Sequence, residues 1–325
     1  MTSLLEVRDL AVQIGPARPV DGVSFALARG EVLGIVGESG SGKSLTLRAI
    51  LKLLPGIART SGAALWQGRD LLAMPEAEIR RLRGREIGMI FQEPMTALDP
   101  VLPIGLQITE SLGEHLALHG AAARRRAVEL LDLVGIPGAR RRLDSFPHEF
   151  SGGMRQRAMI AIALAGEPKL LLADEPTTAL DVTIQDQILR LLLRLRDELA
   201  MSVILVTHDL GIVAGTCDRV AVLYAGRIME TGPTGAIYRT PGHAYTLGLM
   251  RSVPHRALAR QRLQGIPGVP PDPGRMPPGC RFAPRCTLAV AACHQAPPPL
   301  RPLGPTHATA CLRAEAVAGM AAVAA

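Results

Sequence analysis

A glycine-rich stretch near the N-terminus contains the residue types that bind a polyphosphate. Residues 37–44 match the pattern G-x-x-x-x-G-K-S. In such a loop, glycines let successive backbone N–H groups face phosphate oxygens, the lysine adds a positive charge, and the last serine hydroxyl binds Mg²⁺. A turn without a ligand is the alternative, but the length, the lysine and the serine all favour a nucleoside triphosphate site. The residues expected to bind the nucleotide are Gly37, Glu38, Ser39, Gly40, Ser41, Gly42, Lys43 and Ser44.

Two adjacent carboxylates follow an apolar run later in the chain. Residues 170–173 are Leu-Leu-Leu-Ala, and Asp174 and Glu175 come next. If the run is a buried strand of a parallel sheet, the acids lie at its carboxyl end, where such sheets bind ligands. Asp174 would then complete the Mg²⁺ shell with Ser44, and Glu175 would orient and polarise the attacking water. The alternative is a pair of acids at a helix start before Pro176.

A second phosphate contact is suggested by Ser151, Gly152 and Gly153, which come just before a helical pattern. Taken alone, this sequence predicts only a helix N-cap. Together with the loop at 37–44, it offers another set of exposed N–H groups at a helix N-terminus. Because it comes about 110 residues later, we expect it to contact the ATP of a neighbouring subunit.

The elements that must position these residues follow from the periodicity of the sequence. The apolar run 32–36 predicts a buried strand just before the loop, and residues 43–54 predict a helix that stops at Pro55. An amphipathic helix over 183–199 and a β-branched run at 202–206 follow the acid pair. This order of strand, helix and strand predicts an α/β fold with a parallel sheet.

Composition changes sharply near residue 250. Thirteen of the 26 prolines fall within residues 254–305, and four of the five cysteines lie between residues 280 and 311. We therefore expect a nucleotide-binding domain over 1–250, with a helical subdomain over about 95–165. Residues 251–325 are expected to form a Cys- and Pro-rich extension that ends in a frayed helix or a disordered tail.

Charge and hydropathy limit the classes of function. The net charge of +7 is compatible with nucleic acid, an anionic membrane surface or a solvated face, but aromatic residues make up only 3% of the chain. That fraction disfavours base-stacking platforms, so we expect no nucleic acid partner. No uninterrupted apolar run reaches about 18 residues, so we expect no membrane span. The N-terminus lacks the pattern of a secretory signal, which favours the cytosol.

Six motifs occur in an order that resembles ABC transporter nucleotide-binding subunits over about residues 4–250. They are the loop at 37–44, Gln92 in Phe91-Gln92-Glu93-Pro94, Ser151-Gly152-Gly153, Asp174-Glu175, Ala179-Leu180-Asp181 and Val206-Thr207-His208-Asp209. The resemblance implies a P-loop ABC ATPase with a parallel-sheet core, an antiparallel β subdomain and a helical subdomain.

The resemblance also implies a role for each motif. Two ATPase subunits would enclose two ATP molecules, each bound by the P-loop of one subunit and the Ser-Gly-Gly segment of the other. Glu175 would activate water, and His208 would contact the γ-phosphate and hold the geometry of Glu175. Gln92 would bind Mg²⁺ and sense the permease, while Asp181 would position the other subunit. Ile14 stands where relatives usually place an aromatic residue that stacks on adenine.

Segments 146–153, 175–183 and 279–286 resemble the dipeptide and oligopeptide importer group, in particular the first of its two paired ATPases. The implied partners are two transmembrane permease subunits, a second homologous ATPase in a heterodimer and, indirectly, an extracytoplasmic solute-binding protein. The chain would then lie at the cytoplasmic face of the inner membrane as a peripheral subunit. Peptides, nickel chelates and glutathione-like solutes all stay open as cargo.

Four cysteines of the extension form the pattern C-x5-C-x6-C-x17-C, at Cys280, Cys286, Cys293 and Cys311. Four thiolates can bind Zn²⁺ or a [4Fe-4S] cluster, and the wide spacing does not match the C-x2-C pairs of common zinc sites. The cluster, which the resemblance also implies, is favoured over zinc and over thiols without metal. Cys217 lies outside this set, and we expect it to be a small buried residue.

Two other functions compete with a transport motor. The basic composition would suit a non-transport ABC ATPase that acts on nucleic acid, but such proteins usually carry two cassettes or a long coiled-coil insertion, and this sequence has neither. A metal-sensing regulator would make the cysteines primary. The complete set of ATPase motifs argues against that alternative.

Overall fold

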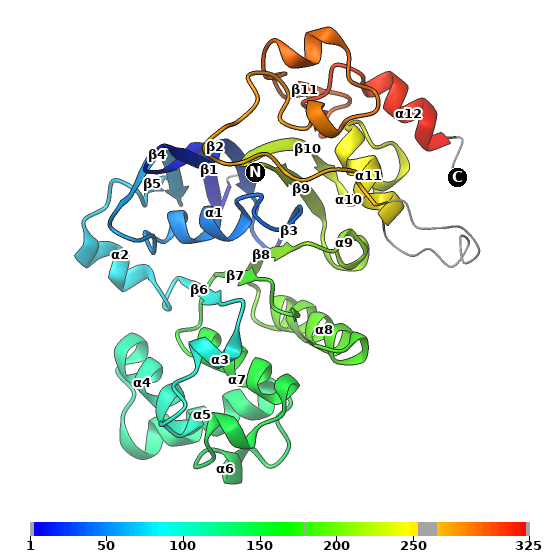
Figure 1. Cartoon of the computed structure of the whole chain (residues 1–325). Coiled ribbons are helices and arrows are strands. Elements are labelled where there is room, and N and C mark those ends of the chain that lie inside the picture. Colours follow the sequence, from blue (N-terminus) through cyan, green and yellow to red (C-terminus); the bar gives the residue numbers. More distant parts are fainter. Residues whose placement is uncertain (1–2, 179, 253–264, 323–325) are drawn as a thin grey trace. The chain divides into compact units, whose positions relative to one another are not determined.

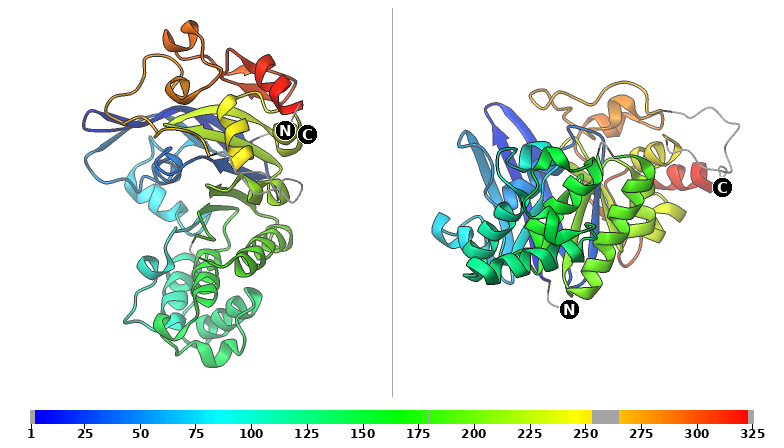
Figure 2. Two further views of the ribbon diagram at one scale, coloured as in Figure 1. Left: turned by 45° about the vertical axis from the view of Figure 1, so that its right-hand side comes forward. Right: turned by 90° about the horizontal axis from the view of Figure 1, so that it is seen from below.

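The computed structural model describes residues 3–178, 180–252 and 265–322 (Figures 1 and 2). These residues divide into two compact units. The first unit comprises the described parts of 1–28, 32–73 and 207–325, and the second comprises 29–31 and 74–206. Each unit has its own strands and its own buried apolar side chains.

The first unit contains an antiparallel sheet with the strand order β2-β1-β4-β5. Its strands are β1 (Leu5–Ile14), β2 (Ala17–Leu27), β4 (Ala58–Trp66) and β5 (Arg69–Asp70). Val23, Phe25 and Leu27 alternate along β2 and are buried, which is the period-2 pattern of a sheet with one covered face. The expected antiparallel β subdomain is confirmed.

A second set of strands in the first unit has the order β11-β12-β10-β9-β3. The strands are β3 (Val32–Val36), β9 (Arg219–Tyr224), β10 (Arg227–Pro233), β11 (Arg301–Pro302) and β12 (Ala308–Thr309). β3 pairs with β9 in parallel, and β12 pairs with β10 antiparallel. Every residue of β3 is buried, which explains its continuous apolar run. The strand predicted at 32–36 is confirmed.

The helices of the first unit follow these strands along the chain. They are α1 (Lys43–Ile50), α9 (Leu210–Thr216), α10 (Thr234–Arg239), α11 (Ala244–Ser252) and α12 (Ala314–Ala322), with 3₁₀ turns η3 (Ala283–Arg285) and η4 (Ala291–His294). α1 ends before the predicted residue 54, because Lys52 adopts a left-handed φ of 53° and the N–H of Leu53 bonds back to the carbonyl of Arg48 at 2.8 Å.

The second unit contains a parallel set of strands with the order β8-β7-β6. The strands are β6 (Ile87–Ile90), β7 (Leu170–Asp174) and β8 (Ser202–Thr207). The helices are α2 (Glu76–Leu82), α3 (Pro94–Ala97), α4 (Ile104–Leu116), α5 (Gly120–Leu133), α6 (Ala139–Arg142), α7 (Gly152–Leu164) and α8 (Val182–Glu198), and η1 (Pro147–Glu149) is a 3₁₀ turn. The predicted parallel sheet and mainly helical middle segment are both confirmed.

The extension contributes β11, β12 and α12 to the first unit. A boundary near residue 250 stays a proposal, as does the limit of the helical subdomain. For the end of the chain, the structure has the helix, α12, as far as Ala322, and residues 323–325 lie outside the described part. No helix in the described ranges is long and apolar enough to cross a membrane.

Candidate nucleotide site

The loop at 37–44 connects the end of β3 to the start of α1. Gly40 and Gly42 have φ values of 77° and 100°, which favour glycine. A Cβ on Gly37 would lie 2.0 Å from the carbonyl oxygen of Leu223, so only glycine fits there. The sequence therefore places glycines where this tight turn requires them.

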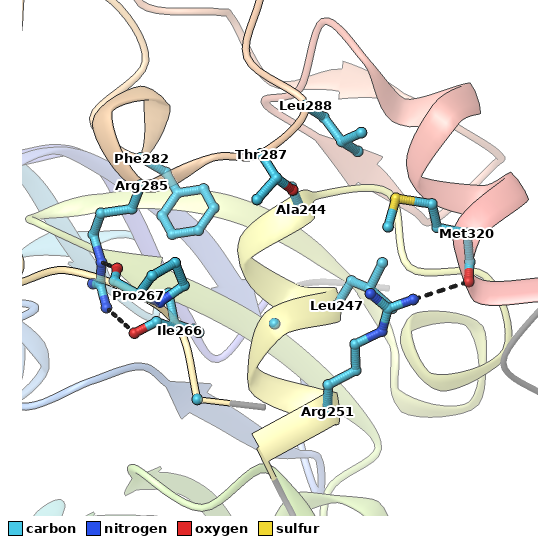
Figure 3. A pocket seen from close by; sticks show the side chains of 12 residues that line it. Ala244, Leu247, Arg251, Ile266, Pro267, Phe282, Arg285, Thr287, Leu288 and Met320 are labelled. Atoms are coloured by element: carbon cyan, nitrogen blue, oxygen red, sulfur yellow. Dashed lines mark hydrogen bonds between the residues drawn. The ribbon is translucent and has the colours of Figure 1, made fainter. Parts of the chain in front are cut away.

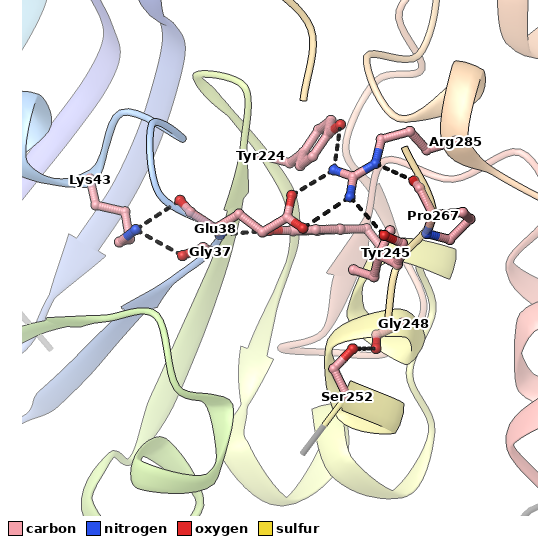
Figure 4. Close-up of polar contacts among 10 residues, drawn as sticks. Gly37, Glu38, Lys43, Tyr224, Tyr245, Gly248, Ser252, Pro267 and Arg285 are labelled. Atoms are coloured by element: carbon pink, nitrogen blue, oxygen red, sulfur yellow. Dashed lines mark hydrogen bonds and ion pairs between the residues drawn. The ribbon is translucent and has the colours of Figure 1, made fainter. Parts of the chain in front are cut away.

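Lys43 is buried at the start of α1. Its Nζ donates hydrogen bonds to the carbonyl oxygens of Gly37 and Glu38, at 2.8 and 2.9 Å (Figure 4). The Lys43 side chain therefore packs along the loop 37–44 and hydrogen-bonds to its first two residues. Its positive charge lies at the N-terminus of α1, where a bound anion is favoured.

The acid pair lies in the second unit, at the end of β7 (Figure 1). Asp174 is fully buried, and the N–H of Glu175 bonds to the carbonyl of Val206 at 3.0 Å. The Glu175 carboxylate accepts hydrogen bonds from the Thr178 hydroxyl at 2.8 Å and from Gln92 Nε2 at 3.4 Å. The structure therefore brings together two of the predicted site residues, Gln92 and Glu175, which lie 83 positions apart in the sequence.

Two other predicted residues begin helices of the second unit. Ser151 is the N-cap of α7 and accepts a hydrogen bond from the N–H of Met154 at 3.3 Å, with Gly152 and Gly153 as the first helical residues. Asp181 is the N-cap of α8 and accepts from the N–H of Ile184 at 2.9 Å. Both caps stabilise their helices. Their expected contacts with another subunit stay predictions.

His208 and Ile14 belong to the first unit, as does the P-loop. His208 is exposed between β8 and α9, and the neighbouring Asp209 caps α9 through the N–H of Gly211 at 2.7 Å. Ile14 ends β1 and is half-buried, paired with Ala17. Glu175, Gln92 and the Ser-Gly-Gly segment belong to the second unit, so the role of His208 toward Glu175 stays a prediction.

Comparison with known proteins decides the family. Residues 20–178 match the ABC transporter family, and residues 229–293 match the C-terminal region of oligopeptide and dipeptide transporters. The oligopeptide transport ATP-binding protein OppD of Bacillus subtilis is 51% identical over 315 residues, which cover 94% of this chain and 88% of that protein. OppD of Salmonella typhimurium is 48% identical, with 95% and 93% covered. The chain belongs to the ABC transporter ATP-binding proteins.

Solved structures agree with this family. The ATP-binding cassette MJ0796, seen as a dimer in a post-hydrolysis state with ADP and phosphate, matches with a TM-score of 0.63 and 28% identity. The match covers 71% of this chain and 98% of that one. The protein is thus an ABC ATPase, as predicted, and ATP with Mg²⁺ is the nucleotide expected for this family.

The four cysteines of the ABC ATPase's extension line one small cavity of about 20 Å³. Burial raises the pKa of Cys280 to about 11 and also raises the pKa of Cys286 and Cys311, and the neighbouring thiols add to the rise. A backbone N–H of Arg313 donates to the sulfur of Cys311 at 3.3 Å. Within the described ranges, however, no three His, Cys, Asp or Glu side chains form a group that could hold a metal ion.

A larger cavity of about 290 Å³ lies beside α11, and its lining includes side chains of the extension (Figure 3). Both of its arginines already have partners: Arg251 donates to the carbonyl of Met320 at 3.1 Å, and Arg285 donates to that of Pro267 at 2.8 Å. Most other lining side chains are apolar. The nucleotide motifs do not line this cavity.

Sequence reasoning missed two residues that hold the predicted ones. The Thr178 hydroxyl donates a hydrogen bond to the Glu175 carboxylate. The two residues are close in sequence, but this contact could be predicted only if the turn that follows the strand were already known. Arg285 pairs with the P-loop residue Glu38 (Figure 4). They are 247 positions apart, so no local pattern could have joined them.

Proposed function

We propose that this ABC ATPase powers the import of peptides through a separate membrane permease. One observation carries the proposal: the similarity to two oligopeptide transport ATP-binding proteins runs through both the cassette and the C-terminal extension. Sequence similarity limited to the cassette would support only a generic ATPase. Import rests on these relatives, because the motor residues themselves do not encode direction.

In this proposal the first unit binds the triphosphate. Lys43 and the N–H groups of the P-loop neutralise the phosphates, which the buried lysine and the glycine-rich turn support. Ser44 would bind Mg²⁺ together with Asp174, and Gln92 would contact the same ion. The metal would polarise the phosphate oxygens.

Glu175 would act as the base that orients the attacking water. The hydrogen bonds from Thr178 and Gln92 support this role, because they fix the direction of the carboxylate. His208 would contact the γ-phosphate. A Ser151–Gly153 segment of one subunit would complete the site of the other, with Asp181 positioning the pair.

The proposed assembly contains two permease subunits and a second, homologous ATPase, at the cytoplasmic face of the cell membrane. A solute-binding protein outside the membrane would deliver the cargo. The dimeric state of MJ0796 supports two cassettes working together. A heterodimer rests on resemblance to the paired ATPases of this importer group.

The test is to purify the chain with its permease and paired ATPase, reconstitute the complex in liposomes and measure ATP hydrolysis and peptide uptake. We expect Glu175→Gln to lower the hydrolysis rate by about 10²–10⁴-fold, with Glu315→Gln, an exposed acid of the extension, as the control that keeps the rate. Uptake of nickel chelates or a glutathione-like solute in place of peptides would contradict the cargo. Hydrolysis stimulated by nucleic acid, without uptake, would contradict the transport function.

We also propose that Cys280, Cys286, Cys293 and Cys311 hold a [4Fe-4S] cluster. Their lining of one shared cavity supports it, since four cysteine thiolates are the ligands that hold such a cluster. The positions of these side chains do not support a cluster, because no group in the described ranges is arranged to hold a metal ion. Anaerobic purification with iron and sulfide analysis tests the proposal, using Cys293→Ser as the defective variant and Cys217→Ser as the control. Zinc alone, or no metal, would contradict it.

A further inference from the structure

The segment between Cys280 and Cys286 carries two buried arginines, Arg281 and Arg285. Buried arginines need partners for their N–H donors, because an unpaired charge in the interior is costly. Both arginines find their partners at or next to the P-loop, in the same unit of the structure.

Arg285 forms a two-pronged ion pair with Glu38, the second residue of the P-loop (Figure 4). Its Nη1 and Nη2 donate to the two carboxylate oxygens at 2.6 and 3.0 Å. The remaining donors go to the Tyr224 hydroxyl at 3.1 Å and to the carbonyls of Pro267 and Ile266. All five N–H donors of this guanidinium therefore have a partner, which fixes its position.

Glu38 connects this ion pair to the rest of the nucleotide site. Its carbonyl accepts a hydrogen bond from Lys43 Nζ, and its N–H donates to the Tyr245 hydroxyl at 2.8 Å. Tyr245 packs against Tyr224 and Phe282, with ring centroids 4.6 and 5.3 Å away. Phe282 lies between the two arginines in sequence, so the same segment supports Glu38 through charge and through packing.

Arg281 supports the neighbouring backbone. It pairs with Asp21 and donates to the carbonyl of Ala225. The next residue, Gly226, donates its N–H to the carbonyl of Ser41 in the P-loop at 2.9 Å. Burial lowers the pKa of Arg281 to about 10, so it stays protonated at neutral pH.

A carboxylate in a phosphate-binding loop raises an electrostatic problem. Glu38 would repel the negative phosphates of ATP, and its side chain is only 27% exposed, so water screens it incompletely. The Arg285 charge, held against both carboxylate oxygens, cancels this repulsion.

We propose that Arg285 is a positioning residue for ATP binding. It acts through Glu38: it cancels the charge of the Glu38 carboxylate and holds the conformation of the P-loop. The segment 280–286 therefore supports the nucleotide site, in addition to being part of the extension. This inference rests on ATP binding at the P-loop and not on the identity of the transported solute.

The experiment compares Arg285→Gln, Glu38→Gln and the double variant. ATP affinity is measured on the full chain by titration calorimetry, and kcat at saturating ATP is measured on the complex with the paired ATPase. Thermal unfolding checks that each variant folds. We expect Arg285→Gln to raise the Kd for ATP by about 10–100-fold while kcat changes less than about threefold. The double variant removes the carboxylate charge as well, so its Kd should return to within about threefold of the wild type.

Controls separate this role from a structural one. Arg275→Gln changes an exposed arginine of the same extension and should leave the Kd unchanged. A weak Arg285→Gln variant that Glu38→Gln does not rescue, or a folded Arg285→Gln variant with wild-type affinity, would overturn the proposal. If Arg285→Gln does not fold, Arg285→Lys decides: it keeps a positive charge beside Glu38, so its Kd for ATP should rise by less than about tenfold, and a larger rise would refute the electrostatic argument. A wild-type complex that fails to take up peptides, while the variants change ATP affinity as expected, would contradict the transport proposal and leave this inference standing.

Discussion

Glu175 adopts a backbone φ of 47°, a left-handed conformation that is uncommon for a residue with a side chain. Such a conformation costs on the order of 1–3 kcal/mol. The bond from its N–H to Val206 and the bond from the Thr178 hydroxyl to its carboxylate keep it there. The direction of the carboxylate is therefore set by neighbours, which is the property that a water-activating base needs.

Thr178→Val tests this at the same residue scale. The variant keeps the shape of the side chain but removes the hydroxyl that donates to Glu175. Because a hydrogen bond to a charged group contributes about 1.5–3 kcal/mol, we expect kcat to fall about tenfold or more, with KM for ATP within about twofold. Steady-state ATPase assays measure both. Thr96→Val, at an exposed threonine of the same unit, should behave as the wild type, and an unchanged kcat in Thr178→Val would contradict the role.

Cys217 gives a second prediction for a single residue. It is buried as expected, against Gly34, and burial raises its pKa to about 12. At pH 8 the thiol is protonated, and the thiolate is the form that reacts. We expect iodoacetamide to leave Cys217 unmodified in the folded protein and to label it in denaturant, as followed by peptide mass spectrometry. Rapid labelling of the native protein would show that the site opens.

At the scale of elements, the turn between β3 and α1 has no room for a side chain at Gly37. Gly37→Ala places a Cβ against a backbone oxygen that belongs to β9 and cannot move alone. We expect a loss of about 1–3 kcal/mol in unfolding free energy and weaker ATP binding, measured by urea denaturation and nucleotide titration.

Gly215→Ala is the matched control for that change. Gly215 lies in α9 with no atom near its Cβ position, so alanine should raise stability by about 0.5–1 kcal/mol through its helix preference. Equal effects of the two substitutions would mean that the turn tolerates a side chain.

Elements bounded by strong local signals were predictable. The fully buried strands β3 and β7 read as continuous apolar runs, and α8 was predicted within one residue of its bounds, Val182–Glu198. The end of α1 was not, because the left-handed Lys52 has no distinctive residue type to announce it. The loop at 37–44 and the acid pair could be located from the sequence, since each motif is contiguous, and their binding roles stay predictions.

At the scale of the molecule, Asp21 joins strand β2 to the extension. It pairs with Arg227, Arg281 and Arg18. Burial alone raises its pKa, but the arginines outweigh this and hold the pKa below the ordinary value of 3.8. The pairing therefore contributes stability above pH 3.8, and the contribution is lost as pH falls through the lower pKa of the folded state.

Asp21→Asn should accordingly destabilise the protein at neutral pH by roughly 2–4 kcal/mol, because it leaves buried Arg281 without its charged partner. The difference from the wild type should shrink below pH 3.8. Denaturant unfolding at pH 7 and at low pH measures it, with the exposed Asp132→Asn as control. A difference that stays constant with pH would assign the effect to shape rather than charge.

Contacts of this kind could not be predicted from the sequence. The pairs Asp21–Arg281 and Glu38–Arg285 join residues 260 and 247 positions apart, and neither arginine stands in a recognisable pattern with its acid. The composition predicted only that residues 251–325 form a Cys- and Pro-rich extension beyond the nucleotide-binding domain. Phe282, packed on Tyr224 and Tyr245, gives it a core shared with the cassette.

The separation of Glu38 and Arg285 along the chain also determines the order in which the two residues are synthesised. A ribosome makes the P-loop early and adds Arg285 only 247 residues later. A nascent or prematurely terminated chain that ends between residues 209 and 285 carries every ATPase motif, yet its Glu38 carboxylate lacks the partner that cancels its charge. Under the role proposed for Arg285, such a fragment binds ATP poorly. Incomplete subunits would therefore not compete with finished ones for the nucleotide.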